Sequence, residues 1–457
     1  MINLLKILPS FRKEWNSAYS MVSPIAAQEL ERFKFYACRI QEMEYSSDPS
    51  IHPSVYVHLA GLLHDEPLLP SLRHIHWVRY QEFEQHMLMF ISPSLRHATI
   101  GASPLLFQLL LSEDSDATNN DDTHGLSTLL ESLCANAPYT QSLTVEGKLP
   151  PDATSLIVRF PNLQKLDLTA AASWTTPNTF TDLGDSHSLI DLGINTSGLQ
   201  LNDIPQGAFR ALQRIEISGT PNSIILVISS ISSKVLRHVA INSTYSFDLS
   251  DWRICIEKIA EEFSSTIRAI RVKLLMGSRS LTPQTHDMMY FIEPLLRSKH
   301  LQVISFDLEG PLRLSDEDLN TMAVRWPDLR NLHLWCHRSG IAPTLTALGS
   351  FTTHCPKLRR LELPADAMVA SKPHDRGPES PSHALQELYL LGNIDVGESE
   401  SAAERIAQLC PNLLSFEGYS WDPEANVRFQ RIRVAIPSLR RITAVAQGAE
   451  TYKYRHP

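Results

Sequence analysis

Apolar and polar positions repeat along the chain in one short phrase. Pro161–Leu168 (PNLQKLDL), Pro327–Leu334 (PDLRNLHL) and Pro356–Leu363 (PKLRRLEL) all follow the pattern L-x-x-L-x-L. The last two apolar residues of the phrase alternate with polar ones, as in a strand with one buried face. We call the first apolar position of each copy its anchor. Fifteen positions qualify: Ile40, Leu72, Leu95, Thr140, Leu163, Leu189, Leu212, Leu236, Ile267, Leu301, Leu329, Leu358, Leu385, Leu413 and Leu439.

The spacing of the anchors predicts the fold. From Thr140 onward they are 23 to 34 residues apart, close to the period of about 20–29 residues of leucine-rich repeats. Helical patterns lie between them, as in 251–263, where Ile254, Ile256, Ile259 and Phe263 fall mostly on one face, and in 401–410. One unit cannot bury its own apolar face, so neighbouring units must stack.

The predicted fold is therefore an α/β leucine-rich-repeat solenoid, a horseshoe with a concave parallel β-sheet and outer helices. A doubly wound α/β domain also alternates strands with helices. Fifteen copies of one motif at a short period argue against that alternative.

The repeats also predict the domain organisation. Residues 1–35 form an N-terminal helical segment before the repeats, 36–446 the solenoid and 447–457 a polar C-terminal tail. Three polar stretches, 112–125, 170–186 and 365–382, interrupt the period, and we expect them to be surface insertions.

Composition narrows the class of protein and its compartment. The chain has 41 Lys and Arg against 50 Asp and Glu, a net charge of −9, so a general field that attracts nucleic acid or anionic lipid is not expected. No apolar run approaches the length of a membrane span. Six scattered cysteines without a CxxC pair, and no secretory leader, favour reduced thiols and an intracellular, cytoplasmic or nuclear, protein.

The common catalytic motifs are absent from the sequence. It contains no phosphate-binding glycine loop, nucleophile elbow or H-E-x-x-H pair. His333, Cys336 and His337 make the densest group of metal ligands, but a fourth ligand for a structural zinc site is not evident. His74 and His76 flank Ile75 on a predicted strand and would share one face, where solvated histidines are the commoner case. We expect no enzyme, no cofactor and no metal.

The L-x-x-L-x-L units preceded by Pro, as in Pro161–Leu168 and Pro356–Leu363, resemble the leucine-rich repeats of F-box proteins. A second resemblance, to the segment that joins the F-box to the first repeat in fungal, mushroom-type members, lies in Val22–Ile25 (VSPI) and Glu31–Ile40 (ERFKFYACRI). Neither the L-P-x-E opening nor the C-x-x-V-C ending of an F-box is found, so the F-box itself is missing or degenerate. The resemblance implies that the repeats hold the substrate of an SCF ubiquitin ligase, with Skp adaptor and cullin as partners only if an F-box lies upstream.

The alternation along the later strands predicts which side chains point outward. We expect the partner to bind the concave surface at Asn331, His333, Trp335, Arg360, Glu362, Glu387 and Tyr389, because aromatic residues and Arg dominate interface hot spots. The alternative is that Trp335 packs against 365–382 and is structural. The basic pairs Arg359-Arg360 and Arg440-Arg441 are interpreted as surface charge.

The expected function is protein–protein recognition, as the substrate-binding part of an F-box-type ligase adaptor. The alternative is a repeat scaffold or inhibitor unconnected with ubiquitination. The partner is a protein, with no role for nucleic acid or membrane.

Overall fold

A computed structural model of the 457-residue chain gives its fold. The structure describes residues 1–13, 18–46, 48, 50–64, 66–79, 85–102, 120–150, 152–172, 177–196, 207–243, 249–274, 286–308, 312–336, 343–364, 384–392, 399–420 and 422–436. Contacts divide the chain into two compact units. Unit 1 comprises residues 1–217 and 230–233, and unit 2 comprises residues 218–229 and 234–457.

The main sheet has 14 strands in the order β20-β19-β18-β17-β15-β13-β12-β11-β10-β8-β6-β5-β4-β3. Every pair whose register is described runs parallel. In unit 1 the strands are β3 (Glu42–Ser46), β4 (His74–Arg79), β5 (His97–Ala102), β6 (Ser142–Val145), β8 (Lys165–Leu168), β10 (Asp191–Asn195) and most of β11 (Arg214–Ser218). In unit 2 they are β12 (His238–Ser243), β13 (Ala269–Leu274), β15 (Val303–Leu308), β17 (Asn331–Cys336), β18 (Arg360–Pro364), β19 (Glu387–Leu391) and β20 (Ser415–Tyr419).

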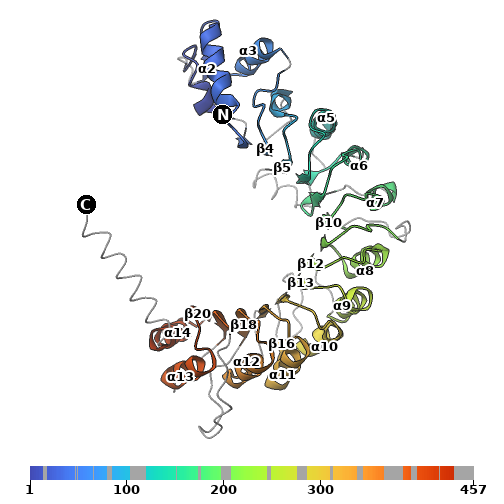
Figure 1. Cartoon of the computed structure of the whole chain (residues 1–457), viewed down its shortest axis with the longest axis vertical. Coiled ribbons are helices and arrows are strands. Elements are labelled where there is room, and N and C mark those ends of the chain that lie inside the picture. Colours follow the sequence, from blue (N-terminus) through green and yellow to red (C-terminus); the bar gives the residue numbers. More distant parts are fainter. Residues whose placement is uncertain are drawn as a thin grey trace, which may run out of the picture. The chain divides into compact units, whose positions relative to one another are not determined.

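Helices alternate with these strands along the chain. Unit 1 contains α1 (Ile2–Leu5), α2 (Ala27–Ala37), α3 (Ser54–Leu63), the 3-10 helix η1 (Gln85–Phe90), α5 (Asn120–Asn136), α6 (Ala153–Ile157) and α7 (Pro177–Gly184). Unit 2 contains most of α8 (Pro221–Ser230), then α9 (Leu249–Phe263), α10 (Met288–Ile292), η2 (Glu293–Arg297), α11 (Asp316–Arg325), η3 (Leu345–Ala347), α12 (Leu348–His354), α13 (Ser399–Leu409) and α14 (Pro423–Ala435). Within each unit the helices lie on one side of the strands (Figure 1).

Three small sheets complete the described structure. The strands β1 (Phe11–Lys13) and β2 (Tyr19–Met21) pair antiparallel in the N-terminal segment, which is therefore not purely helical. The two-residue strands β7 (Gly147–Lys148) and β9 (Ala171–Ala172) pair parallel, as do β14 (His286–Asp287) and β16 (Leu312–Arg313).

The repeat pattern accounts for the strands one by one. Each of the 14 strands begins two residues after an anchor, and the fifteenth anchor, Leu439, lies outside the described residues. In most copies the anchor and the two inward residues are buried and form the core, as with Leu329, Leu332 and Leu334, all 0% exposed. Each leucine side chain buried in this way contributes about 1.5–3 kcal/mol. The prediction of an α/β leucine-rich-repeat solenoid is confirmed.

The backbone fixes the register between repeats. Within each unit, the residue after an anchor accepts two backbone hydrogen bonds from the next described copy. The carbonyl of Arg330, for example, accepts from the amides of Arg359 and Arg360, at 2.8 and 3.2 Å. The same arrangement joins Gln302 to Arg330 and Asn331. Equal offsets from the anchors therefore place equivalent residues side by side across the sheet.

Two expectations about the connecting segments are wrong. Part of the predicted insertion 170–186 is helix α7, because Phe180 and Leu183, three residues apart, are both buried. Helix α5 likewise takes in the end of 112–125, whereas 365–382 lies outside the described residues. On α9, Ile254 is 53% exposed, and Trp252 and Cys255 are buried in its place. At 100° per residue, Ile254 lies opposite Ile256, Ile259 and Phe263.

Candidate partner-binding surface

The predicted partner residues lie together on one face of unit 2. We call this the strand face, meaning the side chains that point away from the helices on the main-sheet strands β12, β13, β15, β17, β18, β19 and β20. Asn331, Arg360 and Glu387 are in register on β17, β18 and β19, and so are His333, Glu362 and Tyr389. The structure thus brings six of the seven predicted residues into two adjacent rows, with Trp335 two residues beyond His333 on β17.

Glu362 lies at the centre of this group. Its carboxylate is 2.7 Å from Nδ1 of His333 and 3.5 Å from Nη2 of Arg360. Its position points outward, as the alternation predicts, but the residue is only 7% exposed. In its row it lies between His333 on β17 and Tyr389 on β19. Burial alone would raise the pKa of Glu362, but the hydrogen bond to His333 and the Arg360 charge outweigh burial and lower it.

Arg360 is held by three groups at once. Its Nη2 faces Glu362 and its Nη1 is 3.4 Å from the carboxylate of Glu387. The guanidinium also lies over the ring of Tyr389, 4.6 Å from the ring centroid. The Tyr389 hydroxyl in turn donates to Glu387 across 3.5 Å. The side chains of β18 and β19 therefore hold one another in a defined arrangement before any partner binds.

Trp335 belongs to an aromatic group that spans several strands. Its ring lies 6.4 Å from that of His333, nearly parallel to it, and 6.2 Å from the ring of Tyr419 on β20. Trp335 is half-buried and Tyr419 is 46% exposed. The segment 365–382, the alternative packing partner of Trp335, lies outside the described residues. The contact with Tyr419 places Trp335 at the strand face.

Tyr419 is a residue that the sequence analysis missed. It lies six residues after its anchor Leu413, just as Trp335 lies six residues after Leu329. The two belong to the same outward row, and this shared offset was the signal that could have found it. The row between them passes Pro364 and Leu391, both buried, which are in register with each other.

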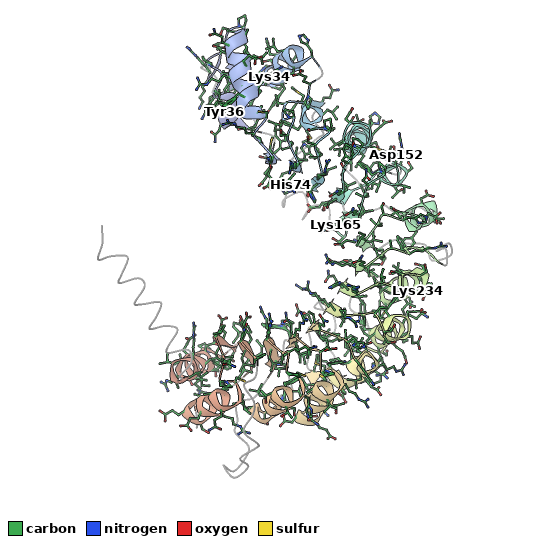
Figure 2. The ribbon with its side chains drawn as sticks, viewed as in Figure 1. Lys34, Tyr36, His74, Asp152, Lys165 and Lys234 are labelled. Atoms are coloured by element: carbon green, nitrogen blue, oxygen red, sulfur yellow. The ribbon has the colours of Figure 1, made fainter. Side chains whose placement is uncertain are left out.

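A second polar group lies on the strands of unit 1. The rings of His74 on β4 and His97 on β5 stack with centroids 4.4 Å apart, and Glu42 lies 3.5 Å from Nδ1 of His74. Figure 2 shows His74 and Lys165 on the side of the strands, away from Asp152 on the helix side. Desolvation lowers the pKa of His97, and the charges of His74 and Lys165 lower it further. His76 points to the same face, as its spacing predicts.

Metal-ligand chemistry finds no support in the described part of the chain. No group of three or more His, Cys, Asp or Glu side chains there could hold an ion. His333 faces Glu362, and His337 lies outside the described residues. Cys255, Cys355 and Cys410 are buried, which raises the pKa of each thiol to about 12. These three thiols are therefore poor ligands and poor nucleophiles.

Comparison with known proteins gives structural likenesses only. No model of a protein family matches the chain, and no curated protein matches it. The structure is similar to that in the yeast Rad7 and Elc1 complex, at 13% identity and a TM-score of 0.40, over 81% of this chain and 85% of that one. It is also similar to the leucine-rich-repeat protein LegL7 of Legionella pneumophila (10% identity, TM-score 0.35, 86% and 97% covered). A leucine-rich-repeat protein of Leptospira interrogans is similar at 13% identity and a TM-score of 0.36, over 91% and 97%.

Within the described residues, no helix combines the length and the apolar character needed to cross a membrane.

Proposed function

We propose that this chain is a recognition protein that binds another protein through the strand face of unit 2 and catalyses no reaction. The observation that supports this is the cluster formed by Trp335, Arg360, Tyr389 and Tyr419, whose members contact one another or shared neighbours. Trp, Tyr and Arg are the residue types that contribute most to binding at protein interfaces. All four are reachable from the same face of four neighbouring strands.

The arrangement also reduces the entropy cost of binding. A mobile long side chain loses about 0.5–1.5 kcal/mol when an interface orders it. Arg360 is already ordered by two carboxylates and a ring, and Tyr389 by Arg360 and Glu387. The charged groups neutralise one another in this cluster, which favours a binding surface over a site that activates a nucleophile or moves a proton.

The test compares three single substitutions in the full chain. We expect Trp335→Ala and Tyr389→Ala each to reduce binding of the physiological partner by about tenfold or more, the loss typical of a hot spot of 1.4 kcal/mol or above. Val324→Ala is the matched control, because Val324 is 50% exposed on α11, on the helix side. Proteins retained from a cell extract are quantified by mass spectrometry for each variant.

A protein that wild type and Val324→Ala retain, and that both strand-face variants lose, identifies the partner. If every retained protein is lost equally with Val324→Ala, or none is lost with Trp335→Ala and Tyr389→Ala, the strand face of unit 2 is not the binding surface. Thermal unfolding of each variant separates a lost contact from a lost fold.

Within this function we propose the role of substrate receptor of an SCF-type ubiquitin ligase, acting inside the cell. The resemblance of Val22–Ile25 and Glu31–Ile40 to the joining segment of mushroom-type F-box proteins supports it. Helix α2 carries much of that segment, buries Phe33 and Ala37, and leads into β3, the first strand of the main sheet. Free cysteines at 38, 134, 255, 355 and 410 are consistent with an intracellular site.

The ligase role is tested by binding to a purified Skp adaptor. Direct binding that survives Trp335→Ala would support the receptor role, because adaptor and substrate would then use different surfaces. A chain that retains its partner but does not bind the adaptor would instead act as a scaffold or inhibitor. The two proposals therefore fail separately.

A further inference from the structure

One edge of unit 2 carries a regular row of long side chains that the strand face does not include. Each is the residue that follows an anchor and directly precedes a strand. We call this the edge row: Arg237, Arg268, Gln302, Arg330, Arg359 and Gln386.

The backbone sets the geometry of the edge row. These residues are the ones whose carbonyls accept two amides from the next repeat, as Arg268 does from Gln302 and Val303, at 2.7 and 3.0 Å. Their Cα positions therefore succeed one another at the spacing of neighbouring strands, about 4.8 Å. Four arginines and two glutamines, all with several N–H donors, line the edge where the strands begin.

The loops that hold the edge row are strongly basic. Residues 264–268, 298–302, 326–330 and 355–359 each join a helix to the next strand, and 234–237 is the end of the connection from α8 to β12. They contain one acid, Asp328, which Lys357 binds at 2.6 Å and His300 at 3.3 Å. Those hydrogen bonds lower the pKa of Asp328. The cations in these loops are Lys234, Arg237, Arg268, Lys299, Arg330, Lys357 and Arg359.

The arginines of the edge row have no counter-charge within the part of the chain that is described. No ion pair or hydrogen bond to another described residue is formed by the side chain of Arg237, Arg268, Arg330 or Arg359. One donor, Nη1 of Arg268, is screened from solvent and has no acceptor. An unpaired guanidinium nitrogen in that state is stabilised when an anionic oxygen reaches it.

Helix dipoles do not account for the edge row. Basic residues at the carboxyl ends of helices offset the dipole, and Arg297, Arg325 and His354 occupy such last turns. That interaction is confined to the last turn. Arg330 and Arg359 follow a further loop, after the helix has ended at Arg325 or His354. Their positive charge is therefore available to a ligand.

We propose that the edge row of unit 2 binds an acidic segment of the partner protein. This rests on the proposed function in protein recognition, but on different residues. The arginine fork matches a carboxylate with two parallel hydrogen bonds, and glutamine amides supply further donors between the arginines. Because the adjoining strand face is the proposed protein-binding surface, the nearest occupant of the edge row is a segment of that bound protein. A short acidic stretch on a protein fits the narrow basic edge.

The experiment uses the full chain and a fluorescein-labelled peptide of about ten glutamates, followed by fluorescence anisotropy at about 50 and 200 mM salt. We expect binding that weakens with salt. Arg330→Gln combined with Arg359→Gln should weaken it by about tenfold at the lower salt. The matched control is Arg431→Gln with Arg433→Gln, which removes the same charge from exposed positions of α14. The control should bind within about twofold of wild type.

Three results would overturn the inference. They are no binding of the peptide, an equal loss in both double variants, or tighter binding of a single-stranded oligonucleotide that Arg330→Gln and Arg359→Gln abolish. If the double variant does not fold, Arg359→Gln alone is measured against Arg433→Gln. Trp335→Ala should bind the peptide like wild type. Unchanged partner binding by Trp335→Ala, with peptide binding retained, would therefore count against the proposed function alone.

Discussion

Among single residues, Glu362 shows how an outward position becomes a buried carboxylate. Its side chain is 10% exposed and contacts both His333 and Arg360. Burying this carboxylate without its partners would cost several kcal/mol, so the three side chains form one unit. Glu387, with 42% of its side chain exposed, contacts the same Arg360 from the solvent side. The two glutamates therefore make different contributions to stability.

We predict a pH-dependent effect of Glu362→Gln. The pKa of Glu362 in the folded chain lies below the ordinary 4.5, so its ionised form stabilises the fold above pH 4.5. This stabilisation disappears as the pH falls through the lowered pKa. Glu362→Gln should cost about 1–2 kcal/mol at pH 7 and progressively less below pH 4.5. Urea unfolding, followed by circular dichroism at pH 7 and again below pH 4.5, measures the change in the free energy of unfolding.

The control for this prediction is Glu387→Gln, a solvated partner of the same arginine, which should cost less than about 0.5 kcal/mol. An equal cost of Glu362→Gln at both pH values would indicate altered packing in place of a lost ion pair.

The sequence predicts which residues of this group share a row, but it does not predict how their side chains pack. The rows follow from the sequence, because His333, Glu362 and Tyr389 each lie four residues after an anchor. The shielding of Glu362 and the approach of Trp335 to Tyr419 do not, because they depend on the rotamers of residues on different strands. Alternation assigns a face, and only the side chains on neighbouring strands decide how much water reaches it.

At the scale of elements, the anchors predicted strands better than the same reasoning predicted helices. A strand here has the same three inward positions in every copy, such as Leu358, Leu361 and Leu363. The α-helices vary in length from α1, with 4 residues, to α5, with 17. A polar stretch such as 170–186 can still contain one buried turn. The strand-to-helix segments thus have no common pattern to detect.

The packing of α14 on β20 gives a prediction at this scale. A Cβ added to Gly418 would lie 1.8 Å from Cδ1 of Phe429, so β20 and α14 touch where only glycine fits. Gly418→Ala must displace the Phe429 ring or the helix, and overpacking of this kind costs about 1–3 kcal/mol. Thermal unfolding, or the urea midpoint, measures the loss.

Gly349→Ala is the matched control on α12. The nearest atom to its added Cβ, Cδ2 of Leu409, is 3.9 Å away. Alanine should raise stability there by about 0.5–1 kcal/mol, because it restricts the unfolded chain and favours helix. Two substitutions of the same chemistry are thus expected to have opposite signs. If Gly418→Ala proves neutral, α14 moves freely over β20.

At the scale of the whole molecule, the repeats interact mainly with their neighbours. In such proteins stability is close to a sum of intrinsic terms and nearest-neighbour terms. A local defect should therefore open the adjoining repeats and leave distant ones closed. The buried thiols of unit 2 report on this, since Cys255 lies on α9, Cys355 follows α12 and Cys410 follows α13.

The last prediction concerns the rates at which these thiols react with a maleimide in mild urea, resolved by peptide mass spectrometry. Exposed Cys38 should react first, because burial shields Cys255, Cys355 and Cys410 and raises the pKa of each to about 12. Gly418→Ala should accelerate the reaction of Cys410 by about tenfold, the effect of ~1.4 kcal/mol of local destabilisation, and that of Cys255 hardly at all. Equal acceleration at all three positions would instead show that unit 2 unfolds as one cooperative body.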